Sequence, residues 1–351
     1  MIDNLDGRLH AQKISVQSQM EFPPVHENLL RTRVDLFIHS KRRVQRKLPS
    51  STINLQATNP TQTQPMPNLT ISSLNIYPVK SLKGISLARM PLSKRGPIFD
   101  REWMIVDSKG KFITQREYAK MALIACDLTE WEDIERIETA TVLTLTLPDG
   151  ETIDIPLDSN DTPTDEPIAV QVWKDTCFAD LEPRATGQLS DFFGAEVRLV
   201  RMRSDFKRIV DPDYCVDGNE TVGFADAHPL MLISDNSLVD LNNRLEIPVE
   251  MNRFRPNITI SGAEAFAEDN WQILSKGDID IHMVKPCARC VITTIDQDTA
   301  DTGKEPLRTL STFRKIDGKI IFGQDACHKF TGDLAELNVG DTLSPKNRTP
   351  G

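Results

Sequence analysis

The sequence predicts a mostly β protein of the α+β class, built from short strands with a few short helices. Between about residue 69 and residue 347, apolar residues occur in short alternating runs, which is the pattern of half-buried strands. Segments that contain Gly, Pro or Asp separate these runs, as turns do. Few segments show helical spacing, and no repeat of fixed period is visible. These observations together favour a barrel or sandwich with helical decoration.

The first expected strand is TISSLNIYPVKS, residues 70–81, which ends at a turn. Residues 101–117, REWMIVDSKGKFITQRE, predict two strands around the turn DSKGK, where Gly110 supplies the permissive backbone. The same pattern recurs in residues 141–157, TVLTLTLPDGETIDIPL, where a PDG turn lies between two alternating segments. The first part of the folded region should therefore consist of consecutive short strands.

Residues 168–181, IAVQVWKDTCFADL, are expected to form one strand with a bend. Residues 188–202, QLSDFFGAEVRLVRM, predict a short helix that ends at Gly194 and is followed by a strand. In residues 230–246, a strand precedes Ser234, which we expect to be the N-cap of a helix. That helix places its leucines on one face, as an amphipathic helix does.

Three further segments complete the expected elements. Residues 253–262, RFRPNITISG, predict a strand that is opened by a proline. Residues 277–299, GDIDIHMVKPCARCVITTIDQDT, predict a strand, a tight Pro/Cys turn and a second strand. Residues 334–344, LAELNVGDTLS, predict a turn and a closing strand. The chemistry-bearing residues of these segments lie at strand ends.

The bulk composition indicates a soluble cytoplasmic protein. The 351 residues carry a formal net charge of −10, which argues against general affinity for nucleic acids or membrane surfaces. No apolar run is long enough for a transmembrane helix, and no secretory signal precedes the folded region. Six irregularly spaced cysteines do not resemble a disulfide scaffold. Residues 1–67 hold a basic cluster and a polar tract, and we expect them to be a disordered or poorly ordered extension.

The segment KPCARC contains the single C-x-x-C of the chain, Cys287 and Cys290. A structural zinc site needs four ligands, and the remaining His and Cys residues show no familiar zinc spacing. A thioredoxin-type pair should precede a helix, whereas the expected strand VITTI follows here. The cysteine spacing of a [2Fe–2S] cluster is absent. The zinc and redox readings stay open as lesser alternatives, beside two buried cysteines at a turn and the favoured interpretation, one reactive thiolate whose pKa the charge of Arg289 would lower.

Other strand-end segments carry cations, and each has an ordinary structural explanation. Lys80 could be a solvated turn lysine, and Arg101 could pair with Asp100 or Glu102. Arg255 could likewise pair with a nearby acid, and His228 could be a core histidine. One soft thiolate can nevertheless bind a transition metal when a cofactor supplies the other ligands.

Five ordered motifs resemble the MOSC family, in particular its two-part members. They are IYPVKSLKG (76–84), DREWMIVD (100–107), FADAHPLMLIS with SLVDLN (224–242), FRPN (254–257) and CARCVITTIDQDT (287–299). The resemblance implies a β-rich N-terminal domain at residues 68–200 and a MOSC β-barrel at residues 201–347. It also implies a molybdenum cofactor held between them and no iron–sulfur cluster in this chain.

The resemblance assigns roles to ten residues. Cys290 matches the thiolate that ligates molybdenum, and Asp226 matches an acid near the metal. The proton donor to the leaving oxygen would be Asp226 or His228. Residues that would hold the pterin and its phosphate are Lys80, Ser81, Arg101, Asn242, Arg255, Asn257 and Arg289. Cationic donors of this kind suit a buried phosphate.

The implied activity is the reduction of small N-hydroxylated compounds. Because the chain stops soon after VGDTLS, we expect a separate electron donor, either a ferredoxin/flavin reductase pair or a haem protein. Two other functions remain open. Cys290 could carry a persulfide as a sulfur carrier, or the protein could store the cofactor without catalysis. The family is also associated with pyridoxal phosphate, but the chain has no recognisable lysine motif for that cofactor.

Overall fold

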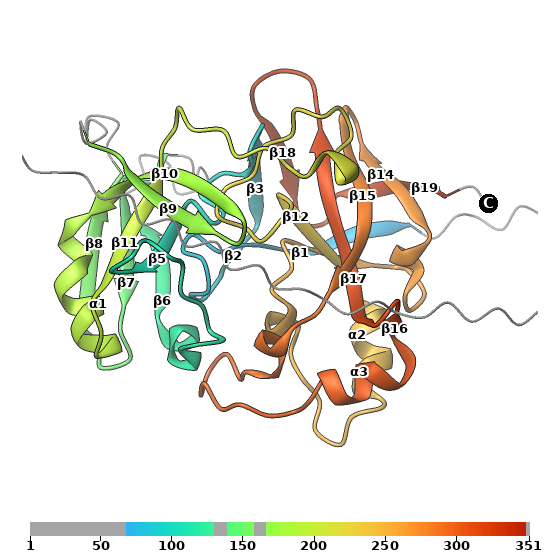
Figure 1. The fold of residues 1–351 in the computed structure, drawn as a ribbon. Helices are drawn as coiled ribbons and strands as arrows, with labels where there is room; N and C mark the ends of the chain where they lie inside the picture. The colour runs from blue at the N-terminus through green and yellow to red at the C-terminus, as the bar shows by residue number, and fades with distance from the viewer. Residues whose placement is uncertain (1–67, 130–138, 158–165, 349–351) are drawn as a thin grey trace, which may run out of the picture. The chain divides into compact units, whose positions relative to one another are not determined.

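The structure is a computed structural model that describes residues 68–129, 139–157 and 166–348. Strands dominate these residues and the helices are few and short, so the predicted mostly β, α+β fold class is confirmed (Figure 1). The prediction for residues 1–67 lies outside the described residues. No helix of the described part combines the length and the hydropathy needed to cross a bilayer.

A closed barrel of seven strands forms the largest sheet. Around the barrel the strands are β12 (Leu230–Ser234), β13 (Ile258–Ser261), β1 (Leu69–Ile76), β19 (Thr342–Asn347), β14 (Trp271–Lys276), β15 (Ile279–Ala288) and β17 (Lys319–Lys329). The barrel closes where β17 pairs with β12, with Ala326 opposite Leu230. Only the β12–β13 pair within it is parallel. Closure leaves no free edge along this sheet.

Smaller sheets surround the barrel. A four-stranded sheet contains β5 (Trp103–Asp107), β11 (Val197–Met202), β10 (Asp175–Glu182) and β9 (Ile168–Val172). Two three-stranded sheets contain β6 (Ala125–Thr129), β7 (Val142–Thr146) and β8 (Thr152–Pro156), and β18 (Ala335–Asn338), β3 (Arg89–Ser93) and β4 (Gly96–Pro97). The short strand β2 (Ile85–Leu87) pairs with β1, and the short strand β16 (Lys315–Ile316) pairs with β17.

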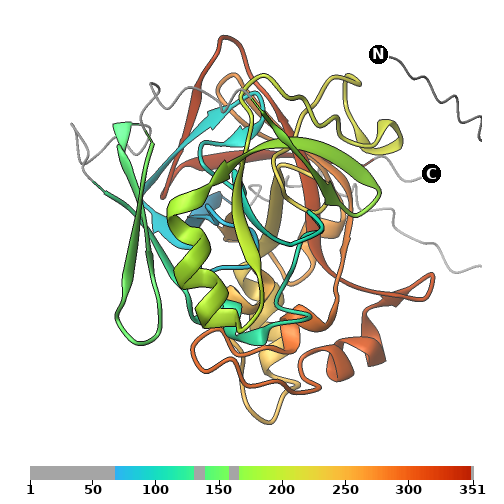
Figure 2. The same cartoon turned by 60° about the vertical axis from the view of Figure 1, so that its left-hand side comes forward.

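Two α-helices lie where local signals predicted a helix, although the second ends before Leu245, which was expected on its apolar face. Helix α1 (Thr186–Phe193) ends at Gly194, whose φ of +67° is the left-handed conformation that glycine adopts most easily. Helix α2 (Asp235–Asn242) starts after Ser234, which has the extended backbone of an N-cap but whose side chain makes no capping hydrogen bond. The third helix, α3 (Leu307–Phe313), precedes β16. Figure 2 brings α1 forward beside the smaller sheets.

Three expected elements differ from the structure. Residues 168–181 form the hairpin β9–β10 rather than one bent strand, because Trp173 and Lys174 make a two-residue loop. Lys111 and Phe112 make isolated bridges where a second strand was expected after the DSKGK turn. In residues 277–299, β15 continues through Pro286 and Cys287, where a tight turn was expected, and VITT is a 3-10 helix, Val291–Thr294, although its residues favour strands. The hairpin was missed because its loop carries Trp173 and no glycine or asparagine.

Strand β1, at the beginning of the described residues, pairs with β19, which lies at their end. It pairs with β13 through Leu74 and Ile258 and with β19 through Leu69 and Leu343. These four side chains are buried in one continuous apolar core. The turn after β1 is thereby held against loops that come from the second half of the chain, which is how residues 150 or more positions apart converge on one site.

Candidate functional site

A cavity of about 300 Å³ lies where loops from both halves of the described chain meet. Its walls carry seven cationic side chains, namely Lys80, Arg101, Arg116, Arg253, Arg255, Lys285 and Arg289. Two carboxylates, Asp226 and Asp325, lie among them. This local excess of positive charge suits an anionic ligand, although the whole protein carries net negative charge.

Nine of the ten predicted site residues line this cavity. They are Lys80, Ser81, Arg101, Asp226, His228, Arg255, Asn257, Arg289 and Cys290. The exception is Asn242, whose amide donates to the Val249 carbonyl at 3.0 Å and accepts from the Val249 amide at 2.9 Å. Asn242 thus folds the segment after α2 back on itself, and the structure does not bring it to the cavity.

Three of these residues have left-handed backbone conformations. Ser81, Arg101 and Arg255 have φ angles of 70°, 48° and 54°. For residues with a side chain this region costs about 1–2 kcal/mol per residue, and such strain concentrates at functional sites. The Arg101 amide donates to the Tyr77 carbonyl at 2.8 Å, which helps to hold the strained turn. The fold therefore forces these side chains to one place.

The Tyr77 ring lies between two guanidinium groups. The Cζ atoms of Arg101 and Arg255 are 4.2 and 4.1 Å from the centre of the ring, within the range of cation–π contacts. Arg101 also pairs with the Asp100 carboxylate at 2.7 Å, as one of the structural explanations anticipated. The Tyr77 ring and the Asp100 carboxylate together offset the repulsion between the two guanidinium groups, which can therefore lie close to each other.

Arg255 has an unused buried donor. Its Nη1 donates to the Leu82 carbonyl at 2.7 Å, whereas its Nη2 is buried and has no hydrogen-bond partner among the described residues. Burial lowers the pKa of Arg255 to about 10, so the guanidinium remains charged at neutral pH. A buried cationic donor without an acceptor is costly. The phosphate of the pterin cofactor implied by the sequence fits this donor set.

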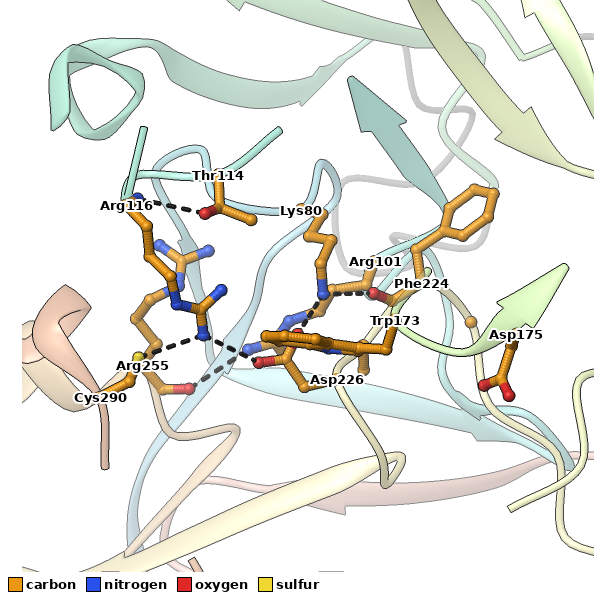
Figure 3. A network of polar contacts seen from close by, with 12 residues as sticks. Lys80, Arg101, Thr114, Arg116, Trp173, Asp175, Phe224, Asp226, Arg255 and Cys290 are labelled. Carbon is orange, nitrogen blue, oxygen red and sulfur yellow. Dashed lines mark hydrogen bonds and ion pairs between the residues drawn. The ribbon is translucent and has the colours of Figure 1, made fainter. Parts of the chain in front are cut away.

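Cys290 presents its thiol beside an arginine that the sequence did not single out. Cys290 follows β15 and is the N-cap residue of the 3-10 helix Val291–Thr294. The Nη2 of Arg116 lies 3.2 Å from the Cys290 Sγ (Figure 3). The neighbour expected from sequence was Arg289, but its guanidinium donates to the carbonyls of Phe322 and Phe254 at 2.8 and 3.1 Å. The cation at the thiol is therefore Arg116.

Lys80 and Asp226 form an ion pair in the cavity wall. Lys80 is almost completely buried, so it is not a solvated turn lysine, and burial lowers its pKa against the effect of Asp226. Removal from water would raise the pKa of Asp226, but the ammonium of Lys80 and the guanidinium of Arg116 outweigh it and hold that pKa well below its ordinary value. Because 55% of the Asp226 side chain is exposed, water also stabilises the carboxylate. Asp226 is consequently ionised at neutral pH.

His228 lies deeper than Asp226 and has a different partner. Its Nδ1 is 3.5 Å from the Asp325 carboxylate, an ion-pair distance, and neither of its two buried ring nitrogens has a hydrogen-bond partner among the described residues. Burial would raise the pKa of Asp325, yet contacts with His228 and the Cys287 thiol hold it below its ordinary value. Burial raises the pKa of Cys287 well above its ordinary value. Cys287 is therefore a protonated thiol.

Sequence reasoning missed Arg116, Asp325 and Trp173. Arg116 follows a turn in TQRE, which is the same type of position as the predicted cations. Asp325 interrupts the apolar strand β17, and an isolated acid in a buried strand is itself a signal of a paired group. Trp173 occupies a hairpin loop, where its φ of +54° would favour glycine.

Comparisons with known proteins found two family models and several relatives that match this chain. Residues 68–196 match the family model of the MOSC N-terminal beta barrel domain, and residues 219–344 match that of the MOSC domain. Mitochondrial amidoxime reducing component 2 of Rattus norvegicus is 34% identical over 294 residues, which cover 78% of this chain and 82% of that protein. Mitochondrial amidoxime-reducing component 1 of Homo sapiens is 32% identical, covering 71% of this chain and 73% of that protein. Molybdenum cofactor sulfurase of Arabidopsis thaliana is 31% identical over 73% of this chain but only 33% of its own length.

Proposed function

The chain belongs to the MOSC family, and from this premise we propose that it is a molybdenum-cofactor-dependent oxidoreductase that reduces N-hydroxylated compounds. Its similarity to two amidoxime-reducing proteins along most of their length supports the reaction class. The observation that carries the proposal is the cavity itself, which combines a thiol, an excess of cations and an unused buried arginine donor.

The residues of the cavity divide into those for the anionic end of the cofactor and those for its metal. Arg255 and Arg101, with Lys80 and Ser81, would hold the phosphate and the polar edge of the pterin. Cys290 would supply a soft thiolate ligand to molybdenum. When bound, the cofactor would supply two-electron redox chemistry and an open coordination position for the substrate.

The remaining polar residues would orient the thiol and supply a proton. Arg116 holds the Cys290 sulfur by a charge-assisted hydrogen bond. Asp226 is ionised and paired with Lys80, so it is a poor proton donor at neutral pH. His228 is the better choice, because the Asp325 carboxylate lies 3.5 Å from its Nδ1 and would stabilise the protonated ring, while Nε2, which has no partner among the described residues, would carry the proton for the leaving oxygen. Electrons would come from a separate ferredoxin/flavin reductase pair or haem protein.

The test is to purify the protein from a host that synthesises the molybdenum cofactor. We expect bound molybdenum, fluorescent oxidised pterin on denaturation, and reduction of benzamidoxime with an artificial reductant. The Cys290→Ala variant should keep its fold, measured by circular dichroism, and lose molybdenum. Cys287→Ala is the matched control and should retain most of it. A folded wild-type protein that neither contains nor takes up the cofactor would refute the proposal.

A second candidate function is sulfur transfer, and the similarity to a molybdenum cofactor sulfurase favours it. Cys290 would then carry a persulfide that a partner desulfurase provides. Incubation with a cysteine desulfurase and cysteine, followed by intact-mass measurement, distinguishes the two functions. A sulfur carrier should gain one sulfur atom at Cys290 and pass it on. An oxidoreductase should instead reduce benzamidoxime and show no transferable sulfur.

A further inference from the structure

A second and larger cavity adjoins the cofactor cavity. It has a volume of about 830 Å³, within the range of sites for small organic ligands. Arg116, Asp226 and Ala227 line both cavities, so the two share one wall. The second cavity is therefore a candidate binding site for a molecule that approaches the proposed reaction centre.

Aromatic and aliphatic side chains form one side of the second cavity. Trp173, at the tip of the β9–β10 hairpin, lies 5.2 Å from Phe112, measured between ring centres. Ile209 and Val210, in the loop after β11, also line this cavity. Trp173 and Ile209 are large apolar residues, yet 46% and 47% of their surfaces are exposed. Such exposure beside a cavity indicates a binding surface.

The backbone at Trp173 gives a second, independent observation. Trp173 has a φ of +54° in a two-residue hairpin loop, where glycine or asparagine is usual. A bulky residue in this conformation is strained, and strain of this kind concentrates at ligand sites. Its ring contacts Phe112 but remains half exposed, so core packing alone does not explain the residue.

The charged residues around this cavity neutralise one another. Arg208 pairs with Asp175 at 2.8 Å, and Lys174 pairs with Asp211 at 3.6 Å. The cavity therefore offers an apolar face with a balanced polar rim, in contrast to the cation-rich cofactor cavity. A neutral ligand with a flat apolar body suits this arrangement better than a phosphate does.

Trp173 also connects the second cavity to the thiol. Its Nε1 donates to Asp226 Oδ1 at 3.2 Å, and the Cζ of Arg116 is 4.9 Å from its ring. The same guanidinium is 3.2 Å from the Cys290 sulfur. Figure 3 shows the indole lying over Asp226, with Arg116 between it and Cys290. A molecule that packs on the indole can therefore extend a polar group toward the thiol.

We propose that the second cavity is a substrate-binding subsite for the planar aromatic body of an N-hydroxylated compound, and that Trp173 determines specificity for it. This inference rests on the proposed reductase function. The N–O group of the substrate would point past Arg116 toward Cys290 while the aromatic body packs on Trp173. Hydroxylamine has no such body and would not use the subsite.

The test compares benzamidoxime with hydroxylamine in the cofactor-loaded enzyme. Trp173→Ala should raise KM for benzamidoxime about tenfold, the effect of one lost aromatic contact, and should lower kcat/KM for hydroxylamine by less than about threefold, since that reaction loses only the contacts of Trp173 with Asp226 and Arg116. Trp173→Phe keeps an aromatic ring and should lose less than about threefold. Phe178→Ala is the control, because Phe178 is as exposed as Trp173, lies on β10 and does not line the cavity. Ile209→Ser should raise KM for benzamidoxime by about threefold.

A binding experiment separates this inference from the proposed function. Calorimetry with benzamidoxime and no reductant measures the dissociation constant without turnover, and Trp173→Ala should weaken it about tenfold. Trp173-dependent binding in a protein that reduces nothing would support the subsite and refute the reductase. Equal losses in Trp173→Ala and Phe178→Ala would overturn the subsite. So would a Trp173→Ala variant that loses hydroxylamine reduction as much as benzamidoxime reduction.

Discussion

The ion pair between Lys80 and Asp226 should be strongly asymmetric in its effect on stability. Only 7% of the Lys80 side chain is exposed, whereas 55% of the Asp226 side chain is exposed. Replacing Asp226 by Asn leaves a buried ammonium without its carboxylate. Replacing Lys80 by Met removes the buried charge and leaves a carboxylate that water and Arg116 can stabilise. The acid, although it is the more exposed partner, should therefore be the more costly residue to remove.

The magnitudes follow from burial. Breaking a fully buried pair costs about 3–5 kcal/mol, and exposed pairs are worth about 0–1 kcal/mol. Because Asp226 is half exposed, we expect Asp226→Asn to lower the free energy of unfolding by about 2 kcal/mol. Lys80→Met should cost less than about 1 kcal/mol, since it replaces the ammonium with an apolar group of similar volume. The double variant should be no less stable than Lys80→Met alone, because neither charge remains.

The assay is thermal unfolding of the apoprotein at pH 7, followed by circular dichroism, so that cofactor loss does not contribute. For a folded region of about 280 residues, about 2 kcal/mol corresponds to a shift of roughly 3–4 °C in Tm. The pKa of Asp226 is lowered in the folded state, so its stabilisation is present above the ordinary pKa of about 4 and is lost as pH falls through the lowered pKa. The difference between wild type and Asp226→Asn should be equal at pH 7 and 5 and smaller at pH 3. If Lys80→Met destabilises the protein as much as Asp226→Asn does, the reasoning from burial is wrong.

Three further predictions test the site. Arg255→Met removes the unpartnered buried donor and should weaken cofactor retention at least tenfold, measured as molybdenum content after dialysis. Gly223→Ala should cost about 2 kcal/mol, because the added Cβ would lie 2.7 Å from the Arg101 carbonyl oxygen. Its control, Gly187→Ala, is in an exposed turn of α1 with no atom within 4 Å of the added Cβ, and it should be neutral or stabilising by up to about 1 kcal/mol. His228→Gln should lower kcat by about 10²–10⁴-fold with molybdenum content unchanged, and an unchanged kcat would exclude His228 as proton donor.

Local chemistry made several elements predictable. The PDG turn between β7 and β8, the glycine that ends α1 and the serine that precedes α2 all act within a few residues. The same local reasoning failed for Val291–Thr294, where β-branched residues form a 3-10 helix. It also failed for the β9–β10 hairpin, because a tryptophan in its loop hides the turn from any rule based on glycine or asparagine.

The neighbours of the Cys290 thiol show a different limit of prediction from sequence. Arg289 is next to Cys290 in the chain, and that proximity predicted the wrong cation. Its guanidinium instead binds carbonyls of the barrel and of the segment before Arg255. Arg116 is 174 positions from Cys290, yet it makes the contact. Two neighbouring positions in the sequence do not tell where their side chains point. The direction of each side chain is determined by packing in the folded chain.

The order of short strands, the turn residues between them and the types of side chain at their ends were properties of the sequence by itself. They determined the β-rich fold, and the resemblance of five motifs to the MOSC family pointed to ten site residues, of which nine line one cavity. Only the tertiary structure decided which cation meets Cys290, which acid lies beside His228, and that Trp173 lines a second cavity. Those relations join residues far apart in the chain, and closure of the barrel around β1 brings them together.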